Sequence, residues 1–267
     1  MTDRREQIDI VLHVTSDYKE KAKTGATCIR RVVRSHGISD IQALRLIVDV
    51  MRQFEMVMEF TQYLPKPQQI PVNKYLKHVE KKGRYFLPVE AGGLKFSFGW
   101  IPLFNHAFLS IEEVATGLET SWAAWVAPFL AIDGFVQAWV TDAEYDYWQN
   151  VKDPLQYEEA GRSYSHLPTK LNGLPPPLEQ MEIDISNNPC RWILQSGFRE
   201  AIGSTMWLSP LFWHLTGTGC KDAELSANGF DVQHEANGII KVVAADHCFC
   251  DETTENVQRK LRSILFN

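Results

Sequence analysis

The clearest periodic pattern places an apolar residue every three to four positions from Ile41 to about Phe60, which predicts an amphipathic helix. Ser39 and Asp40 precede it directly, and both residue types are favoured helix N-caps. Residues 253–266 show the same spacing and predict a closing helix. Residues 18–35 are compatible with a helix that is basic on one side, which Gly25 weakens and Gly37 would end.

Alternation of apolar and polar positions predicts strands in seven other segments, at residues 7–15, 83–101, 104–111, 135–140, 181–185, 191–194 and 239–244. Thr141 or Asp142 can cap a helix through Trp148, and residues 151–177 predict a long ordered loop that ends in three prolines. These elements predict an α+β fold with a mixed or antiparallel sheet flanked by helices. We expect a single compact domain over residues 1–267, with an N-terminal α/β part (1–90) and a motif-bearing part (91–267).

The most apolar stretch of the chain is GFREAIGSTMWLSPLFWHLTG, at residues 197–217. Proline is tolerated in the first turn of a helix but not in its interior. We therefore expect one short helix that ends near Leu208 and a second that begins at Ser209-Pro210. Aromatic side chains dominate protein cores, so Trp207 and Trp213 are predicted to be buried, with an exposed aromatic anchor as the alternative.

Charge is distributed unevenly in a chain whose formal net charge is −6. Residues 1–90 hold 16 Lys and Arg against 11 Asp and Glu, whereas residues 91–267 hold 11 against 22. Because phosphate contacts need Lys and Arg, the acidic part is a poor nucleic-acid binder. It suits a basic protein partner, which an acidic surface steers, and the alternative is a solvated face that keeps the protein soluble.

Several features predict a cytoplasmic protein. The apolar runs are shorter than the roughly 18 residues of a membrane span, so no membrane interaction is expected. The first ten residues lack the apolar core of a secretory signal. The five cysteines are odd in number and scattered, which does not suggest a disulfide framework.

Common catalytic motifs are missing from the sequence. Neither Ser196 nor Ser204 lies in a G-x-S-x-G turn, and His234-Glu235 continues as Ala-Asn-Gly, unlike a zinc-protease helix. The Gly217-to-Lys221 run lacks the spacing of a phosphate-binding loop. We therefore predict no catalytic and no cofactor-binding residues, and a protein that is not an enzyme.

Two clusters of residues in the sequence are candidates for metal binding or for acid–base catalysis. His247, Cys248 and Cys250 follow Asp246, but a C-x-C pair alone does not complete a tetrahedral zinc site, so we predict no metal and a strand end with buried thiols. His166 follows the adjacent acids Glu158 and Glu159, for which an interaction loop is the preferred interpretation. The alternative function is a hydrolase-like enzyme that uses His166 or His247.

Four motifs together resemble a known family. SWAAWVAPFLAIDGFVQAW (121–139), AEYDYWQN with DPLQYEEAGRSYSHLP (143–168), GLPPPLE (173–179) and NPCRWIL with the 197–217 stretch (188–217) resemble the immunity protein 52 family of bacterial polymorphic-toxin systems. The resemblance covers roughly the C-terminal two thirds, and Ser209 stands where the family pattern suggests glycine. It implies a cytoplasmic protein, encoded beside a restriction-endonuclease-like toxin of a system such as type VI secretion. Its implied function is to bind and neutralise that cognate nuclease toxin.

The acidic and aromatic middle of the chain is the predicted contact with such a toxin. A nuclease presents a basic surface to phosphate, which Asp and Glu can occupy, while Tyr and Trp are favoured interface anchors. The basic N-terminal face is an alternative contact, and a scaffold without a toxin partner is an alternative function. The predicted partner-binding residues are Asp142, Glu144, Tyr145, Asp146, Tyr147, Trp148, Glu158 and Glu159.

Overall fold

A ten-stranded sheet forms the centre of the computed structural model, which describes residues 4–24, 27–63, 66–82, 88–116, 118, 120–250 and 252–266. Its strand order is β15-β16-β14-β9-β1-β8-β7-β6-β4-β5, and every neighbouring pair is antiparallel. This confirms the predicted α+β class and selects the antiparallel alternative. The strands are β1 (Glu6–His13), β4 (Glu59–Gln62), β5 (Gln68–Pro71), β6 (Val89–Ala91), β7 (Leu94–Ile101), β8 (His106–Glu113), β9 (Phe135–Asp142), β14 (Thr205–Leu208), β15 (Asp231–His234) and β16 (Ile240–Val243).

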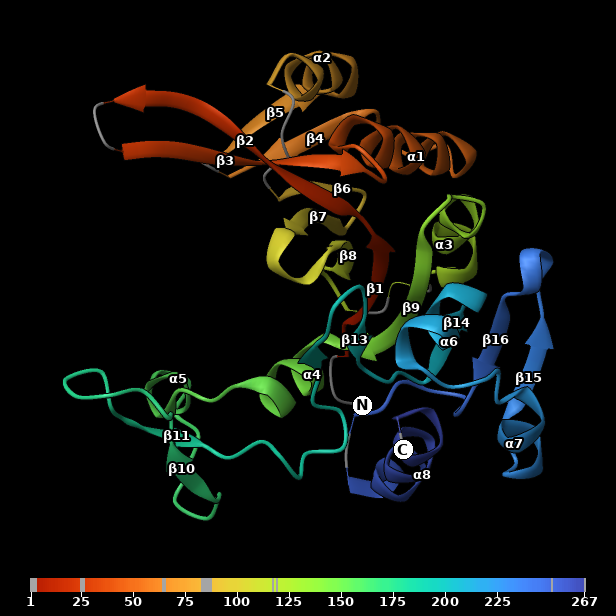
Figure 1. The fold of residues 1–267 in the computed structure, drawn as a ribbon. Coiled ribbons are helices and arrows are strands. Elements are labelled where there is room, and N and C mark those ends of the chain that lie inside the picture. The colour runs from red at the N-terminus through yellow and green to blue at the C-terminus, as the bar shows by residue number, and fades with distance from the viewer. Residues whose placement is uncertain are drawn as a thin grey trace.

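Both faces of this sheet are covered by helices. Ile8, Ile10 and Leu12 of β1 are buried in one core, with α1 (Asp40–Gln53), α2 (Val72–Lys82) and α3 (Trp122–Leu130). Val11 points to a second core, with α6 (Pro210–Thr216), α7 (Asp222–Ala227) and α8 (Glu255–Phe266). The alternation of β1 thus places the two cores on opposite faces, as Figure 1 lets the reader follow.

Helix α1 confirms the strongest periodic prediction but ends earlier than expected. Ser39 and Gln42 form a capping box, in which the Gln42 amide donates to Ser39 Oγ (3.3 Å) and the Ser39 amide donates to Gln42 Oε1 (2.9 Å). The helix ends at Gln53, and Glu55 takes a left-handed φ of 51°. Phe60 therefore belongs to β4, and its prediction as helix is wrong.

The predicted helix over residues 18–35 is also wrong. This segment forms an antiparallel hairpin of β2 (Thr15–Thr24) and β3 (Thr27–His36), with Tyr18 opposite Val32. β-Branched residues are frequent in 27–36 and favour extended backbone. Gly37, at φ 101°, turns the chain after the hairpin, where a Cβ would lie 2.9 Å from the His13 carbonyl oxygen. It does not end a helix.

The apolar 197–217 stretch contains one error and one confirmed element. The segment expected to be a helix near Leu208 is strand β14, where Trp207 lies between Ala138 of β9 and Lys241 of β16. Consecutive apolar residues are buried there because both faces of the sheet are covered. Helix α6 begins as predicted after Ser209, whose Oγ accepts from the Phe212 amide (3.3 Å) and donates to the Phe135 carbonyl (2.7 Å).

Both tryptophans of this stretch are in the core, with Trp207 2% and Trp213 4% exposed, as predicted. The strand predictions at 7–15, 104–111, 135–140 and 239–244 correspond to β1, β8, β9 and β16, and the closing helix is α8. Residues 92–93 form the expected Gly-Gly turn between β6 and β7, while 83–87 lie outside the described residues. None of the described helices combines the length and apolar character that a membrane crossing needs.

The region from Asp142 to residue 200 departs from the sheet. Asp142 caps α4 (Ala143–Asn150), as predicted. The expected loop at 151–177 contains α5 (Pro154–Glu159) and β10 (Thr169–Leu171), which pairs with β11 (Met181–Ile183). The strand predicted at 191–194 is reduced to β12 (Ile193–Leu194), paired with β13 (Arg199–Glu200). The remaining short helical turns are η1 (Pro102–Phe104), η2 (Ala236–Gly238) and η3 (Glu252–Thr254).

Candidate functional site

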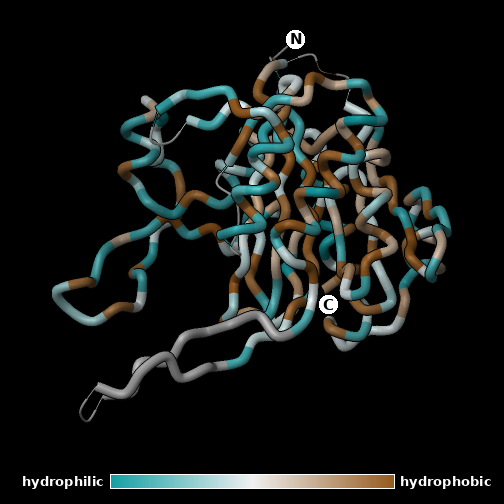
Figure 2. The backbone as a smooth tube through the Cα atoms, turned by 90° about the horizontal axis from the view of Figure 1, so that it is seen from above, coloured by the Kyte–Doolittle hydropathy of each residue, from teal (hydrophilic) through white to brown (hydrophobic). Residues whose placement is uncertain are grey.

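Residues 151–190, which we call the arm, stand away from the sheet. Figure 1 shows α5, β10 and β11 on the side of the molecule opposite α7 and β15, and Figure 2 shows the same projection from above. The arm has its own small core, in which Val151, Tyr157, Ile183 and Ile185 are buried. The Ile183 amide donates to the Lys152 carbonyl (2.8 Å), which fixes β11 to the start of the arm. The arm is therefore a packed unit rather than an extended loop.

The surface of the arm carries uncompensated negative charge. Its three bases are already committed to ion pairs: Lys152 with Glu182 (3.8 Å), Lys170 with Asp184 (2.8 Å), and Arg162 with Glu144 of α4. The acids outside these pairs are Asp153, Glu158, Glu159 and Glu179. Surface pairs neutralise charge locally without burying it, so the arm as a whole presents an acidic face.

Apolar side chains are also exposed on the arm. Leu155, Leu171, Leu174, Leu178 and Met181 belong to the large hydrophobic residues of the described chain that remain exposed, and Leu178 is 64% exposed. Isolated surface leucines are ordinary, whereas five exposed large apolar side chains within residues 155–181 make this segment a candidate contact surface. Tyr147 of α4, 49% exposed, lies beside the same segment, where its hydroxyl donates to Gln156 Oε1 (2.8 Å).

The structure separates the eight predicted partner-binding residues into two groups. Glu144, Tyr147, Glu158 and Glu159 are exposed. Asp142 and Asp146 are buried, while Tyr145 and Trp148 are half-buried. The sequence did not distinguish them because all eight residues are polar or aromatic and lie close together in the chain.

The less exposed residues have structural partners. Asp142 accepts from the Tyr145 amide (2.8 Å) as the N-cap of α4, and burial raises the pKa of its carboxyl. The Tyr145 hydroxyl donates to Gln258 of α8 (3.0 Å). The Trp148 ring contacts Tyr157, with 4.8 Å between centroids, and Arg162 lies over it at 4.3 Å. The inward side of α4 thus joins the arm to the sheet.

A buried charge cluster, missed from the sequence, lies under α4. Gln7 Nε2 of β1 donates weakly to Asp9 (3.4 Å) and to Asp146 (3.5 Å), and the Arg199 guanidinium lies over the Phe108 ring at 4.8 Å. Burial, and then the neighbouring Asp9, raise the pKa of Asp146 to about 8. Burial also raises the pKa of Asp9, so this pair retains a proton at neutral pH. In the sequence, this cluster is indicated only by Asp9, an aspartate inside the apolar run that forms β1.

A groove of about 1080 Å³ separates the arm from the sheet. Its walls combine apolar side chains such as Ile185 and Trp192 with the Lys95–Glu112 ion pair (2.9 Å) of β7 and β8. Asp146 reaches the same groove from α4. The arm is joined to α4 by the Arg162–Glu144 ion pair and the Trp148–Tyr157 ring contact, and the groove lies between it and β1, β7 and β8.

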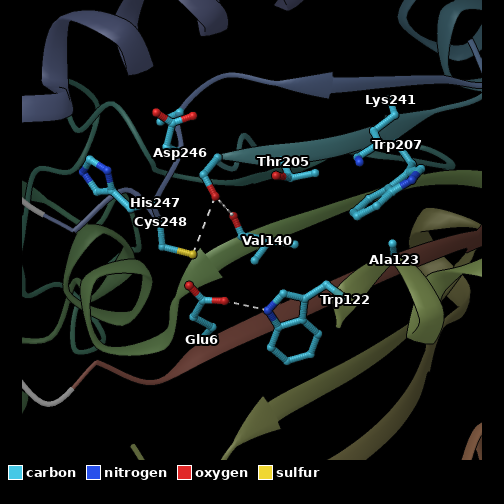
Figure 3. A pocket seen from close by; sticks show the side chains of 12 residues that line it. Glu6, Trp122, Ala123, Val140, Thr205, Trp207, Lys241, Asp246, His247 and Cys248 are labelled. Carbon is cyan, nitrogen blue, oxygen red and sulfur yellow. Dashed lines mark hydrogen bonds between the residues drawn. The ribbon is translucent and has the colours of Figure 1, made fainter. Parts of the chain in front are cut away.

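A smaller cavity of about 210 Å³ is lined by residues of β9, β14 and β16 and of the segment 245–248, and Figure 3 shows its lining. Trp122 Nε1 donates to Glu6 Oε2 (2.7 Å), and Ser204 Oγ contacts Cys248 Sγ (3.6 Å). Burial raises the pKa of the Cys248 thiol far above its ordinary value, so the thiol is protonated at neutral pH and is a poor nucleophile.

The two histidines of the alternative hydrolase function are both exposed and lie in different parts of the molecule. His247 is exposed and, with Asp246, lies at the end of the cavity opposite Lys241 and Trp207 (Figure 3). His166 is exposed on the arm, where Glu158 accepts from the Tyr164 hydroxyl (2.7 Å). Among the described residues, no group of three or more His, Cys, Asp and Glu side chains could hold a metal ion.

Comparison with known proteins gives one structural likeness. No family model matches the chain, and no curated protein matches it. A solved Pseudomonas aeruginosa T6SS protein, PA0821, is 11% identical, with a TM-score of 0.46 over 98% of this chain and 73% of that one. Membership of the immunity protein 52 family stays a prediction.

Proposed function

We propose that this protein is a cytoplasmic immunity protein that binds and neutralises a nuclease-type toxin, and that the arm is its contact surface. The observation that carries the proposal is the concentration of exposed acidic and apolar side chains on a segment outside the main sheet. The sheet has its own two cores, to which the arm contributes only its last residue, Cys190. The motif resemblance supplies the class of partner.

Charge supports a basic partner. Residues 142–190 contain nine acids (Asp142, Glu144, Asp146, Asp153, Glu158, Glu159, Glu179, Glu182, Asp184) and three bases (Lys152, Arg162, Lys170). Their difference of six negative charges equals the formal net charge of the whole chain. An acidic surface accelerates encounter with a basic protein such as a nuclease and disfavours binding to nucleic acid itself.

The exposed members of the predicted contact fit this role better than the buried ones. Glu158 and Glu159 lie at the end of α5, and Tyr147 projects from α4 beside them. Charges at the rim of an interface mainly change the association rate, whereas central apolar residues hold the complex. We therefore assign steering to Glu158 and Glu159 and leave Asp142 and Asp146 to the fold.

The test is coexpression of the tagged protein with the product of its neighbouring reading frame. We expect a stable one-to-one complex and rescue of growth. Glu158→Lys with Glu159→Lys should weaken the complex. Glu224→Lys with Glu235→Lys, two exposed acids near α7 and β15, makes the same charge change at the opposite side and should not.

Absence of a complex, together with a neighbour that is harmless when expressed alone, would contradict the proposal. Attention would then turn to the hydrolase alternative and to His166→Ala and His247→Ala. If both double variants form the complex equally well, the proposed function stands, but Glu158 and Glu159 do not contribute to the interface.

A further inference from the structure

The tip of the arm, residues 171–181, exposes four apolar side chains in eleven positions. Leu171 and Met181 lie opposite each other at the ends of β10 and β11, and Leu174 and Leu178 belong to the loop between them. Each is about half exposed or more, at 55% for Leu171, 50% for Leu174, 64% for Leu178 and 49% for Met181. Full burial of such a side chain by a partner would remove the apolar area that the fold leaves in water.

This loop is held in one conformation by Asn172. The Asn172 side-chain oxygen accepts from the amides of Leu174 (3.1 Å) and Gln180 (3.3 Å), and its Nδ2 donates to the Leu178 carbonyl (2.9 Å). The Leu178 amide donates to the Pro175 carbonyl (3.0 Å), and prolines at 175–177 restrict the backbone further. The apolar side chains are thus presented by an ordered loop, which lowers the entropy lost on binding.

The apolar side of the hairpin continues from the arm's core to its tip. Ile183 is buried in that core, and Met181, two residues earlier on the same side of β11, is exposed. Glu179, which precedes β11, lies outside the three ion pairs of the arm, whereas Glu182, on the other side of β11, and Asp184 pair with Lys152 and Lys170. The apolar tip therefore belongs to an arm that holds six acids and three bases.

We propose that residues 171–181 form the anchor of the interface and enter an apolar depression in the basic partner. This inference rests on the proposed function and names the part of the arm that holds the complex. A second copy of the chain fits the tip poorly, because two acidic arms would be brought together and like charges across an interface oppose binding. A basic partner has the charge that complements the net negative charge of the arm.

The test compares dissociation rates on an immobilised product of the neighbouring reading frame. Leu174→Ala with Leu178→Ala should raise the dissociation rate by about tenfold or more and leave the association rate almost unchanged. Leu103→Ala removes a leucine that is 80% exposed on η1, outside the arm, and should change neither rate. Because these side chains are exposed, we expect unchanged melting curves, and light scattering should show the free protein to be a monomer.

Different failures have different meanings. If the double leucine variant dissociates like the wild type, the anchor is not the tip, although the proposed function stands. If the free protein is a dimer that the double variant dissociates, the tip binds a second copy and the inference is overturned. If the wild-type protein does not bind the product, the proposed function and the inference fall together. Asn172→Ala should raise the dissociation rate too, because it disorders the loop and retains every leucine.

Discussion

The sheet and the arm use apolar residues in opposite ways. All eight residues of β9 are buried, and even its polar Gln137 is satisfied by the Arg199 backbone (3.0 and 3.3 Å). The arm buries only a small core and leaves several leucines in water. Hydrophobic burial accounts for the stability of the first region. In the arm it applies only to the small core around Tyr157, and the exposed leucines form the surface that we propose binds the partner.

Helix α4 belongs to both regions and marks their boundary. Asp146 and Tyr145 turn toward the sheet and α8, where they are buried or half-buried. Glu144 and Tyr147 turn toward solvent and the arm. Neighbouring residues of α4 therefore contact different regions. A substitution at one of them tests either the packing against the sheet or the surface beside the arm.

The largest expected difference between the regions is in stability. Trp207→Ala should lower the free energy of unfolding by about 3–5 kcal/mol, because it leaves a cavity in the core that packs against one face of the sheet. Leu178→Ala in the arm should change it by less than about 0.5 kcal/mol, since the leucine is exposed. Urea denaturation measures both, and similar losses for the two variants would contradict the contrast.

A smaller effect concerns pH and the buried side of α4. Burial and Asp9 raise the pKa of Asp146 to about 8, from an ordinary value of 3.8. The folded protein therefore binds the proton more tightly than the unfolded chain, and this stabilisation is lost as the pH rises through that range. One such proton lowers the free energy of unfolding by at most about 1.4 kcal/mol per pH unit.

Asp146→Asn should flatten this dependence, because the amide cannot ionise. Its advantage over the wild type should grow from about pH 5 to about pH 8 in urea denaturation, and Glu159→Gln, at an exposed acid, should leave the wild-type slope unchanged. A difference between Asp146→Asn and the wild type that stays constant over this interval would contradict the assignment of a shared proton to Asp9 and Asp146.

The smallest expected effect concerns rates of encounter rather than stability. Glu158→Lys with Glu159→Lys should slow association with the basic partner several-fold, on the order of tenfold at low salt, and the effect should shrink at high salt. Unfolding should be almost unaffected, since both side chains are exposed. An unchanged association rate at low salt, measured against Glu224→Lys with Glu235→Lys, would remove these acids from the contact.

Long or well-capped elements could be predicted from the sequence. Ser39, Asp142 and Ser209 each mark a helix start through a side-chain oxygen that accepts a backbone hydrogen bond. Met206 to Leu208 could not be assigned correctly, because a short apolar run fits a doubly covered strand and a helix equally well. The helix prediction for residues 18–35 failed because the spacing of their basic residues suggested one face of a helix, whereas the segment forms the paired strands β2 and β3.

The candidate site was predicted only in part. Of the eight predicted contact residues, the structure leaves Glu144, Tyr147, Glu158 and Glu159 exposed. Asp142 and Asp146 are buried, and Asp146 lies near Asp9 of β1 and Arg199 of β13, which are distant in sequence. The leucines at 171–178 carry no sequence signal of exposure, since leucine is ordinarily a core residue. Their exposure follows from the position of the arm outside the sheet, which no local pattern of the sequence indicates.

Hydrogen exchange of the protein, free and bound to the product of its neighbouring reading frame, tests the central claim most directly. Binding through the arm predicts slower exchange in α5 and in residues 171–181 of the complex, with little change in β9, β14 and β16. The account is contradicted if a stable complex forms and the arm exchanges as fast as it does in the free protein.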